Sequence, residues 1–261
     1  METAEFVTSE FTQGVLQLTL NRPKANAFNI QMITELHSAL RIAAKKTEVR
    51  VVLLTGEGQI FSAGQDVKEF GQVAEAGELS FRQHLLRTYN PLILQIRQLE
   101  KPVLAAVNGP VAGAALGIAL ACDLRIAADT ARFVVGFLGI GLAPDSGISL
   151  FLPSLIGLGR AAEYAFSNQP ISAEQALDWG LINRVVPASD LASQAHSWAQ
   201  ELAEGPIQAM GLAKRDFNRA VYPNLEQVLD YEAHIQEIAG HGPDHHEGLQ
   251  SFIEKRQPKY A

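Results

Sequence analysis

The chain has 261 residues, 47% of them hydrophobic and 19% charged, so it can bury a large core and disorder is not expected as its main state. Its formal net charge of -7 provides no general attraction for nucleic acid or an anionic membrane surface, and neither is an expected partner. The single cysteine, Cys122, excludes an internal disulfide framework and a multi-cysteine metal site. The first residues are acidic and lack the apolar stretch of a secretory signal, so we expect a cytoplasmic protein.

The N-terminal half alternates between the residue spacings typical of strands and of helices. A strand is predicted over residues 14–20, a helix from Ile30 with Asn29 as its cap, and a buried strand over residues 49–56. Another helix is predicted from about Leu79 to Leu99. Strands separated by helices require crossover connections, which indicates mixed α/β structure.

Residues 102–122 carry no charge and are long enough in principle to span a bilayer. The sequence Asn-Gly-Pro at 108–110 would break a helix in the middle of such a span. VLAAV before this break is typical of a buried strand, and the apolar residues 113–122 after it are typical of a helix. We therefore predict a buried strand, turn and helix, with Cys122 as a small core residue.

The second half is predicted to be mostly helical. Ser172 and Gln175 have the spacing of a capping box, and residues 181–186 suggest one late strand. Residues 191–261 are predicted to form three amphipathic helices, with breaks at Gly-Pro and Pro positions. Residues 1–190 would then form an α/β core and residues 191–261 a helical C-terminal region.

Two glycine-containing turns follow apolar strands, over residues 62–66 and 108–117. Both can present bare backbone amides, and the second opens a helix, so the N–H of Ala114 would lie where unpaired donors favour a negative oxygen. Two such amides would make an oxyanion hole. Taken alone, each turn is more often structural, because glycine turns are common where strands end.

Asp145 lies in the sequence APDSG, ahead of an apolar helix. Pro-Asp-Ser-Gly is a turn sequence and aspartate is a good helix cap, so the residues alone favour a structural role. The histidine-rich sequence HGPDHHEG at 241–248 is interpreted as a solvated helix start rather than a metal site.

Several stretches, in their order and approximate spacing, resemble the crotonase (enoyl-CoA hydratase/isomerase) family up to about residue 190. They are LTLNRPKANAFN, VVLLTGEGQIFSAGQDVKEF, KPVLAAVNGPVAGAALGIALACDLRIAAD and ISAEQALDWGLINRVV. The resemblance implies the α/β crotonase (ClpP-like) fold of repeated ββα units, with a C-terminal helical region used for trimer packing. It also implies an acyl-CoA thioester substrate and a homotrimer or a hexamer formed as a dimer of trimers. No metal or redox cofactor is required, since coenzyme A is part of the substrate.

Carried over onto this sequence, the family's two oxyanion-hole amides fall on Gln65 and Ala114. The segments that resemble the family's CoA-binding edge contain Arg22, Lys24, Ala25, Ala63, Gly64, Asp66 and Val67. The resemblance implies that Lys24 could meet a phosphate of CoA there. From the residues alone, Arg22 and Lys24 could equally be a solvated surface pair.

The two glutamates of the family's hydratases are absent, because Gly117 and Phe137 occupy their positions. Asp145 instead resembles the acting aspartate of ring-1,2-epoxyphenylacetyl-CoA isomerases, and also the nucleophile of 4-chlorobenzoyl-CoA dehalogenases. The histidine and tryptophan of the dehalogenases are replaced by Asn90 and Phe137. The resemblance therefore favours isomerisation over two-glutamate hydration and over dehalogenation.

The predicted function is an acyl-CoA isomerase that acts through a thioester enolate, with Asp145 as base and an acyl pocket containing Asn90, Phe137 and Leu142. It would shift a double bond from 3-enoyl-CoA to 2-enoyl-CoA, and its oxyanion hole could support ring expansion of an aromatic epoxide to an oxepin. One alternative is a hydratase or another crotonase-type lyase or hydrolase. A second is a non-catalytic acyl-CoA-binding homologue.

Overall fold

A six-stranded sheet forms the centre of the structure, a computed structural model that describes residues 5–67 and 80–260. Its strands, in spatial order, are β1 (Val7–Thr12), β2 (Val15–Leu20), β3 (Val51–Gly56), β4 (Val103–Val107), β6 (Leu124–Ala128) and β9 (Arg184–Val186). The first two are antiparallel and all other neighbours are parallel. The predicted strands at 14–20, 49–56, 103–107 and 181–186 are confirmed. The polar edge strand β1 was not predicted.

A smaller sheet contains three short strands, β5 (Val111–Ala112), β7 (Arg132–Val134) and β8 (Ile171–Ser172). The chain enters this sheet twice directly from the large one, since β5 follows β4 and β7 follows β6, and a helix comes next. This is the expected arrangement of repeated ββα units. The small sheet holds the turn after β4 beside the turn after β3, through a bridge between Ser62 and Val111.

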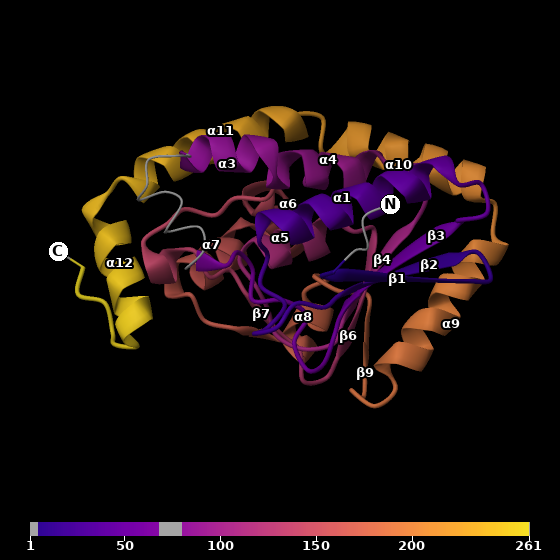
Figure 1. The fold of residues 1–261 in the computed structure, drawn as a ribbon, viewed down its shortest axis with the longest axis horizontal. Coiled ribbons are helices and arrows are strands. Elements are labelled where there is room, and N and C mark those ends of the chain that lie inside the picture. The colour runs from indigo at the N-terminus through magenta and orange to yellow at the C-terminus, as the bar shows by residue number, and fades with distance from the viewer. Residues whose placement is uncertain (1–4, 68–79, 261) are drawn as a thin grey trace.

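Helices cover one face of the large sheet (Figure 1). They include α1 (Ile30–Lys45), α4 (Tyr89–Gln98) and α5 (Ala114–Ala121). Asn29 caps α1 as predicted, because its side chain accepts a hydrogen bond from the Met32 amide at 2.9 Å. Strand β4 and helix α5 confirm the buried strand, turn and helix over residues 102–122, and Cys122 is buried. None of the described helices combines the length and apolarity needed to cross a membrane.

The single helix predicted over residues 79–99 is wrong in its continuity. Two helices, α3 (Phe81–Arg87) and α4, meet at Thr88, and residue 79 lies outside the described residues. Pro91 explains the break, since in a continuous helix its ring would clash with the Arg87 carbonyl and could not donate to it. In the first turn of a new helix, the missing N–H of proline has no consequence.

The opposite face of the sheet is covered by α9 (Leu191–Glu204). Its Ala195 and Trp198 pack on Val51, Leu53 and other inward residues of the strands. The C-terminal region forms four helices rather than the predicted three, because each Gly-Pro or Pro break ends one helix. The others are α10 (Ile207–Val221), α11 (Leu225–Gly240) and α12 (Pro243–Glu254).

The remaining elements connect the second half of the chain and position the site. They are the 3-10 helix η1 (Leu138–Ile140), α6 (Ile148–Ile156), α7 (Leu158–Ser167) and α8 (Ala173–Asp178). The predicted capping box of α8 is present, between Ser172 and Gln175. Helix α11 runs beside α3, α4 and α6, and α12 packs on η1 at one end of the molecule (Figure 1).

Candidate active site

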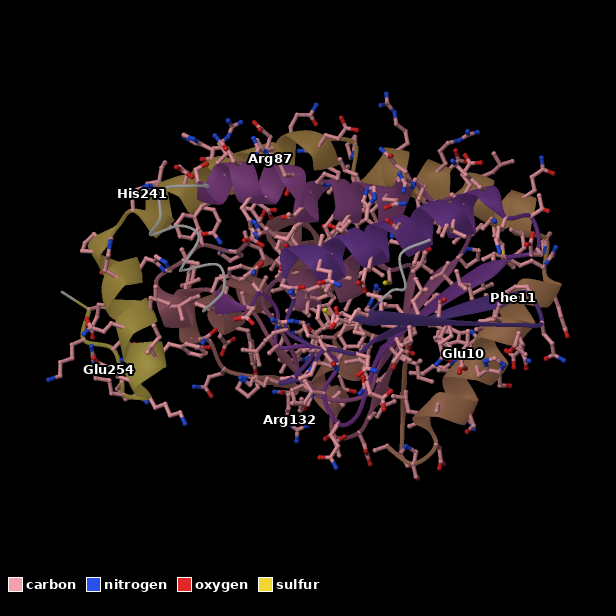
Figure 2. All side chains as sticks on the ribbon, viewed as in Figure 1. Glu10, Phe11, Arg87, Arg132, His241 and Glu254 are labelled. Atoms are coloured by element: carbon pink, nitrogen blue, oxygen red, sulfur yellow. The ribbon has the colours of Figure 1, made fainter. Side chains whose placement is uncertain are left out.

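A cavity of about 970 Å³ lies where the turns after β3 and β5 meet α3, η1, α11 and α12. Its apolar lining includes Phe81, Leu85, Phe137, Ile140, Leu142, Leu249 and Phe252. Its polar lining includes Lys24, Gln65, Asp66, His84, Tyr89, Asp145, Gln236, His241 and His245. His241 lies at the end of α11, beside α12 (Figure 2). A concave, mostly apolar site with a few polar groups is typical of ligand binding.

The direction of the Gln65 amide follows from its peptide plane. The Gly64 carbonyl accepts a hydrogen bond from the Phe28 amide at 2.7 Å. In a trans peptide the C=O and N–H point in opposite directions, so the Gln65 N–H points away from Phe28. Among the described residues, this N–H donates no backbone hydrogen bond, and Gln65 lines the cavity.

The Ala114 amide is presented in the same way by α5. The Gly113 carbonyl is turned along the helix, where it accepts from the amides of Leu116 and Gly117, so the Ala114 N–H points out of the helix start. A Cβ atom placed on Gly64 would lie 3.4 Å from the Ala114 nitrogen, which shows that the two turns are in contact. The two predicted oxyanion-hole residues are therefore brought together beside the cavity.

Asp145 lines the same cavity and is only 5% exposed. Its Oδ1 accepts a hydrogen bond from Ser146 Oγ at 2.7 Å, and its Oδ2 accepts one from Gln236 Nε2 at 2.8 Å. Burial raises the pKa of the carboxyl group to about 6, although both hydrogen bonds oppose this rise by favouring the charged form. A carboxylate with this pKa is suited to act as a base near neutral pH.

The interpretation of Asp145 as a helix cap is not supported, because another residue performs that role. Glu232 of α11 accepts hydrogen bonds from the Gly147 amide at 2.8 Å and the Ser149 amide at 3.0 Å, at the start of α6. Burial raises the pKa of Glu232 to about 7, and the nearby charge of Asp145 contributes to this rise. Because Glu232 accepts from the amides at the start of α6, the Asp145 carboxylate does not cap this helix and is part of the cavity lining.

Glu232 and Gln236 were missed by the sequence analysis. Both lie on the buried stripe of α11 with Leu225, Leu229 and Ala233. A glutamate and a glutamine inside an apolar stripe of helical spacing were the available signal, because buried polar side chains need partners. What the stripe could not indicate is that those partners belong to the turn around Asp145.

Replacing Gln236 by leucine is expected to move the acid limb of the pH–activity profile to higher pH by about one unit. The variant removes a hydrogen bond that favours ionised Asp145, and bonds to charged groups contribute about 1.5–3 kcal/mol. The profile of kcat/KM against pH checks this. A limb at the wild-type position would show that Gln236 does not tune Asp145.

Gly117 provides the space for the turn that carries Asp145. A Cβ atom on Gly117 would lie 2.5 Å from the Ser146 carbonyl oxygen and 2.6 Å from the Ser146 Cβ. Ser146 itself has a φ of 57°, a conformation that L-residues adopt only when the surroundings hold it. Any side chain at 117 would therefore collide with the Asp145 turn.

Part of the predicted CoA-binding edge lies on the wall of the cavity. Lys24, Ala63, Asp66 and Val67 line it, and Lys24 is exposed. Arg22 forms a 2.9 Å ion pair with Asp66, so it braces the edge rather than forming a solvated pair with Lys24. Ala25, in the turn after β2, and Gly64, in the turn after β3, have φ of 75° and 86° and are not among the lining residues.

The predicted acyl-pocket residues divide into two groups. Phe137 and Leu142 line the cavity, whereas Asn90 is not among its lining residues. Asn90 is buried, and its Nδ2 donates to the Leu229 carbonyl of α11 at 3.0 Å. Its side chain therefore holds α4 to α11.

The segment at 241–248 does begin a helix, but one of its histidines is not solvated. His245 is 7% exposed, lines the cavity, and contacts the Ile140 carbonyl through Nδ1 at 2.8 Å. The prediction of a fully solvated start is corrected, since α12 packs closely against η1. Within residues 5–67 and 80–260, no group of three or more potential ligands is arranged to hold a metal ion.

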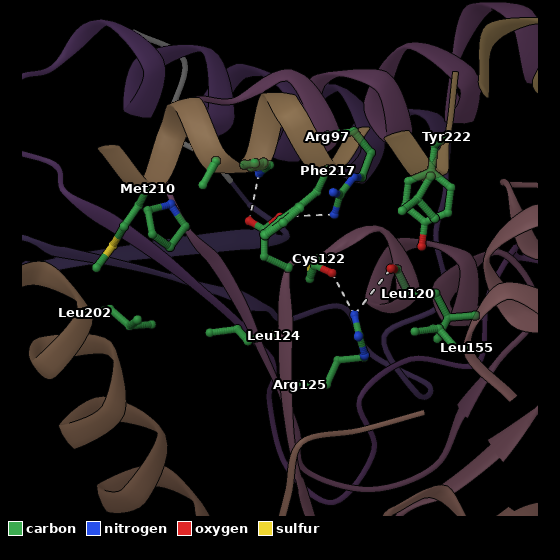
Figure 3. A pocket seen from close by; sticks show the side chains of 15 residues that line it. Arg97, Leu120, Cys122, Leu124, Arg125, Leu155, Leu202, Met210, Phe217 and Tyr222 are labelled. Atoms are coloured by element: carbon green, nitrogen blue, oxygen red, sulfur yellow. Dashed lines mark hydrogen bonds and ion pairs between the residues drawn. The ribbon is translucent and has the colours of Figure 1, made fainter. Parts of the chain in front are cut away.

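A second cavity, of about 410 Å³, lies between β6, the end of α5 and helix α10 (Figure 3). It shares no lining residue with the first cavity. Its charged side chains are already bonded within the protein: Arg97 and Lys214 both contact Asp123, and Arg125 donates to backbone carbonyls that include Cys122. These side chains stabilise the fold around Cys122 and offer no uncommitted group for chemistry.

Known proteins match this chain over nearly its whole length. The family model described as enoyl-CoA hydratase/isomerase matches residues 10–261. The 1,2-epoxyphenylacetyl-CoA isomerase of Escherichia coli is 39% identical over 258 residues, covering 98% of both chains. A probable enoyl-CoA hydratase of Rhodobacter capsulatus is 40% identical over 253 residues, covering 97% of this chain and 96% of the relative.

Among solved structures, an enoyl-CoA hydratase from Mycobacterium avium subsp. paratuberculosis is similar with a TM-score of 0.88 and 32% identity, over 99% of both chains. The similarity thus extends over the sheet, the turns around the cavity and the C-terminal helices alike. On the match of nearly the whole chain to one family model and to these relatives, the protein belongs to the enoyl-CoA hydratase/isomerase family and has its crotonase fold.

Proposed function

We propose that this enzyme is an acyl-CoA isomerase that converts a 3-enoyl-CoA to the 2-enoyl-CoA through a thioester enolate. The observation that carries the proposal is the composition of one cavity. It holds the buried carboxylate of Asp145, whose pKa is raised to about 6, next to the turns that present the Gln65 and Ala114 amides. These are a base and two hydrogen-bond donors, the groups that enolate formation requires.

In the proposed reaction the thioester carbonyl accepts hydrogen bonds from the Gln65 and Ala114 N–H groups. Asp145 removes a proton from C2, and the electron pair of that C–H bond delocalises onto the thioester oxygen as an enolate. The same carboxyl group returns the proton to C4, so the double bond moves from C3–C4 to C2–C3. Each oxyanion donor contributes about 3–4 kcal/mol to such a step.

Hydration by two glutamates is disfavoured by the packing around the site. The resemblance to the family places one glutamate at Gly117, where the Asp145 turn leaves no room for a side chain. It places the other at Phe137, which is buried and apolar. A two-glutamate site has two carboxylates that activate a water molecule. The cavity of this protein instead has the buried carboxylate of Asp145 among largely apolar residues.

An aromatic acyl group is the substrate that the cavity supports best. Phe81, Phe137 and Tyr89 line it, and Phe81 meets His245 edge to face at a centroid distance of 5.3 Å. Aromatic side chains bind aromatic rings through such offset and edge contacts. With the epoxide of a phenylacetyl-CoA, the reaction named for the Escherichia coli relative, the same enolate step would precede ring expansion to the oxepin.

The proposal also includes the CoA site and the assembly. Lys24, which is exposed and lines the cavity, would meet a CoA phosphate. Large apolar side chains that are more than half exposed, among them Leu158, Phe166, Phe217 and Ile238, support burial in a homotrimer or hexamer.

Incubation with a 3-enoyl-CoA is expected to produce the conjugated 2-enoyl-CoA, measured by its ultraviolet absorbance. Hydration of a 2-enoyl-CoA, measured as loss of the same absorbance, is expected to be at least about 10²-fold slower, because the site lacks the second catalytic carboxylate. Faster hydration than isomerisation would contradict the proposal. Binding of acyl-CoA with no turnover in either assay would favour a non-catalytic binding protein.

A further inference from the structure

The side chain of Gln65 is held at both ends. Its Nε2 donates to the Phe28 carbonyl at 3.1 Å and lies 3.4 Å from the Asp66 carbonyl. Its Oε1 accepts from the Tyr89 hydroxyl at 2.7 Å and meets His84 Nε2 at 3.0 Å. A carboxamide nitrogen can donate two hydrogen bonds and its oxygen can only accept. In this orientation the Gln65 nitrogen donates and the Gln65 oxygen accepts.

The two donors come from either side of the break between α3 and α4. His84 lies in the last turn of α3 and Tyr89 is the first residue of α4, and both are almost fully buried, at 4% and 1% exposure. Burial lowers the pKa of His84 to about 4, so the ring is neutral near pH 7. Because the Gln65 oxygen can only accept, the neutral ring carries its proton on Nε2.

The backbone beside Gln65 needs such support. Gly64 precedes it with a φ of 86°, and glycine imposes little restriction on the rotation of the peptide that contains the Gln65 N–H. That peptide is held on one side by the hydrogen bond from the Phe28 amide to the Gly64 carbonyl. On the other side of Gln65, the Asp66 amide donates to the Phe28 carbonyl at 2.8 Å, and the bonds of the Gln65 side chain to Phe28, Tyr89 and His84 add to this support.

We propose that the Gln65 side chain, anchored by Tyr89 and His84, is a positioning group that orients its own backbone N–H toward the thioester oxygen. This inference rests on the proposed function, because it assumes that the Gln65 N–H belongs to an oxyanion hole. The alignment of such donors with the developing charge sets much of their effect. The side chain at this position therefore tunes catalysis without touching the reacting atoms.

The test compares Gln65→Met and Tyr89→Phe with the wild-type protein. Methionine has a similar length but cannot accept the two hydrogen bonds, and Tyr89→Phe removes only one donor. For Gln65→Met, kcat is expected to fall about 10-fold with KM changed less than about twofold, since the N–H is misaligned rather than removed. Tyr89→Phe is expected to give a smaller fall of the same kind.

Carbonyl polarisation is read directly with cinnamoyl-CoA, a conjugated thioester that has no C4 proton for the isomerase to remove. Its absorption is expected to move to longer wavelength in the wild-type complex and to move less in both variants. Gln175→Met is the matched control, because it removes a comparable side chain, bonded to Ser172 and Tyr164, outside the cavity. It is expected to keep the wild-type spectral shift.

The outcomes separate the two proposals. A full spectral shift and unchanged kcat in Gln65→Met would overturn the positioning role while leaving the oxyanion hole intact. No shift in the wild-type complex, or loss of cinnamoyl-CoA by hydration, would overturn the proposed function itself. If Gln65→Met does not fold, Tyr89→Phe decides the question by the same two readings.

Discussion

Replacing Asp145 by asparagine is expected to remove the isomerase activity and to make the protein more stable near neutral pH. Loss of a general base lowers kcat by about 10²–10⁴-fold. The stability gain follows from burial, which raises the pKa of this carboxyl group from 3.8 to about 6. A difference of about two pKa units corresponds to about 3 kcal/mol. The free energy of unfolding falls by this amount when Asp145 ionises in the folded protein.

The stability gain of Asp145→Asn is expected to depend on pH in a defined direction and range. The wild-type protein has the full stability associated with protonated Asp145 below pH 3.8, and loses it as the pH rises through about 6. Asp145→Asn should therefore be more stable than wild type at pH 8, with the difference shrinking toward pH 4. The new side chain can keep both partners, because its oxygen can accept from Gln236 Nε2 and its nitrogen can donate to the Ser146 hydroxyl oxygen.

Urea unfolding of both proteins between pH 4 and pH 8, together with the double-bond-shift assay, checks this prediction. Full isomerase activity in Asp145→Asn would show that another group is the base. Equal stability of the two proteins at every pH would show that Asp145 is not a buried carboxylate with a raised pKa. Glu232→Gln is a useful comparison, since it also neutralises a buried carboxylate but disturbs the α6 amides instead.

Replacing Gly117 by alanine is expected to lower both stability and activity, although the change adds one methyl group. Its Cβ would lie 2.5 Å from a backbone oxygen of Ser146, so the turn that carries Asp145 must move. Overpacking of this kind costs about 1–3 kcal/mol. A displacement of the base by about 1 Å is expected to lower kcat about 10²-fold.

Gly159→Ala is the matched control, because Gly159 also lies in a helix, α7, but a Cβ there meets no atom within 4 Å. That variant is expected to be as active as wild type and about 0.5–1 kcal/mol more stable, from helix propensity alone. Thermal unfolding and kcat/KM measurements on the two variants check the contrast. If Gly117→Ala behaves like Gly159→Ala, the turn is not confined by Gly117.

The order of strands and helices was largely readable from the sequence, because hydrophobic periodicity reports which residues face a core. Strands β2, β3, β4 and β9, helix α1 with its Asn29 cap, and the capping box of α8 were all predicted. Periodicity failed where a strand is mostly exposed, as in the edge strand β1. It also failed where a strand is very short, as in the two- and three-residue strands of the small sheet. The break at Thr88 was also missed, although Pro91 marks it.

The site was only partly predictable, for a different reason. Local sequence identifies turns that can present an amide or a carboxylate, and the family resemblance then led to Gln65, Ala114 and Asp145. It does not report the state of those groups, since the pKa of Asp145 depends on its burial and on Gln236, which is distant in the chain. The same holds for Asn90, which bonds to Leu229 rather than lining the cavity.

Asp145 illustrates which properties of this protein follow from the sequence and which depend on the tertiary structure. The sequence alone determined the α/β fold, the family resemblance and an aspartate in a turn, because these are recorded in composition, spacing and motif. Only the tertiary structure decided that Glu232 caps α6, that Gly117 leaves room for the turn, and that Gln236 holds the carboxylate beside the cavity. Those contacts join residues up to 91 positions apart, and no local pattern encodes which distant side chains will meet.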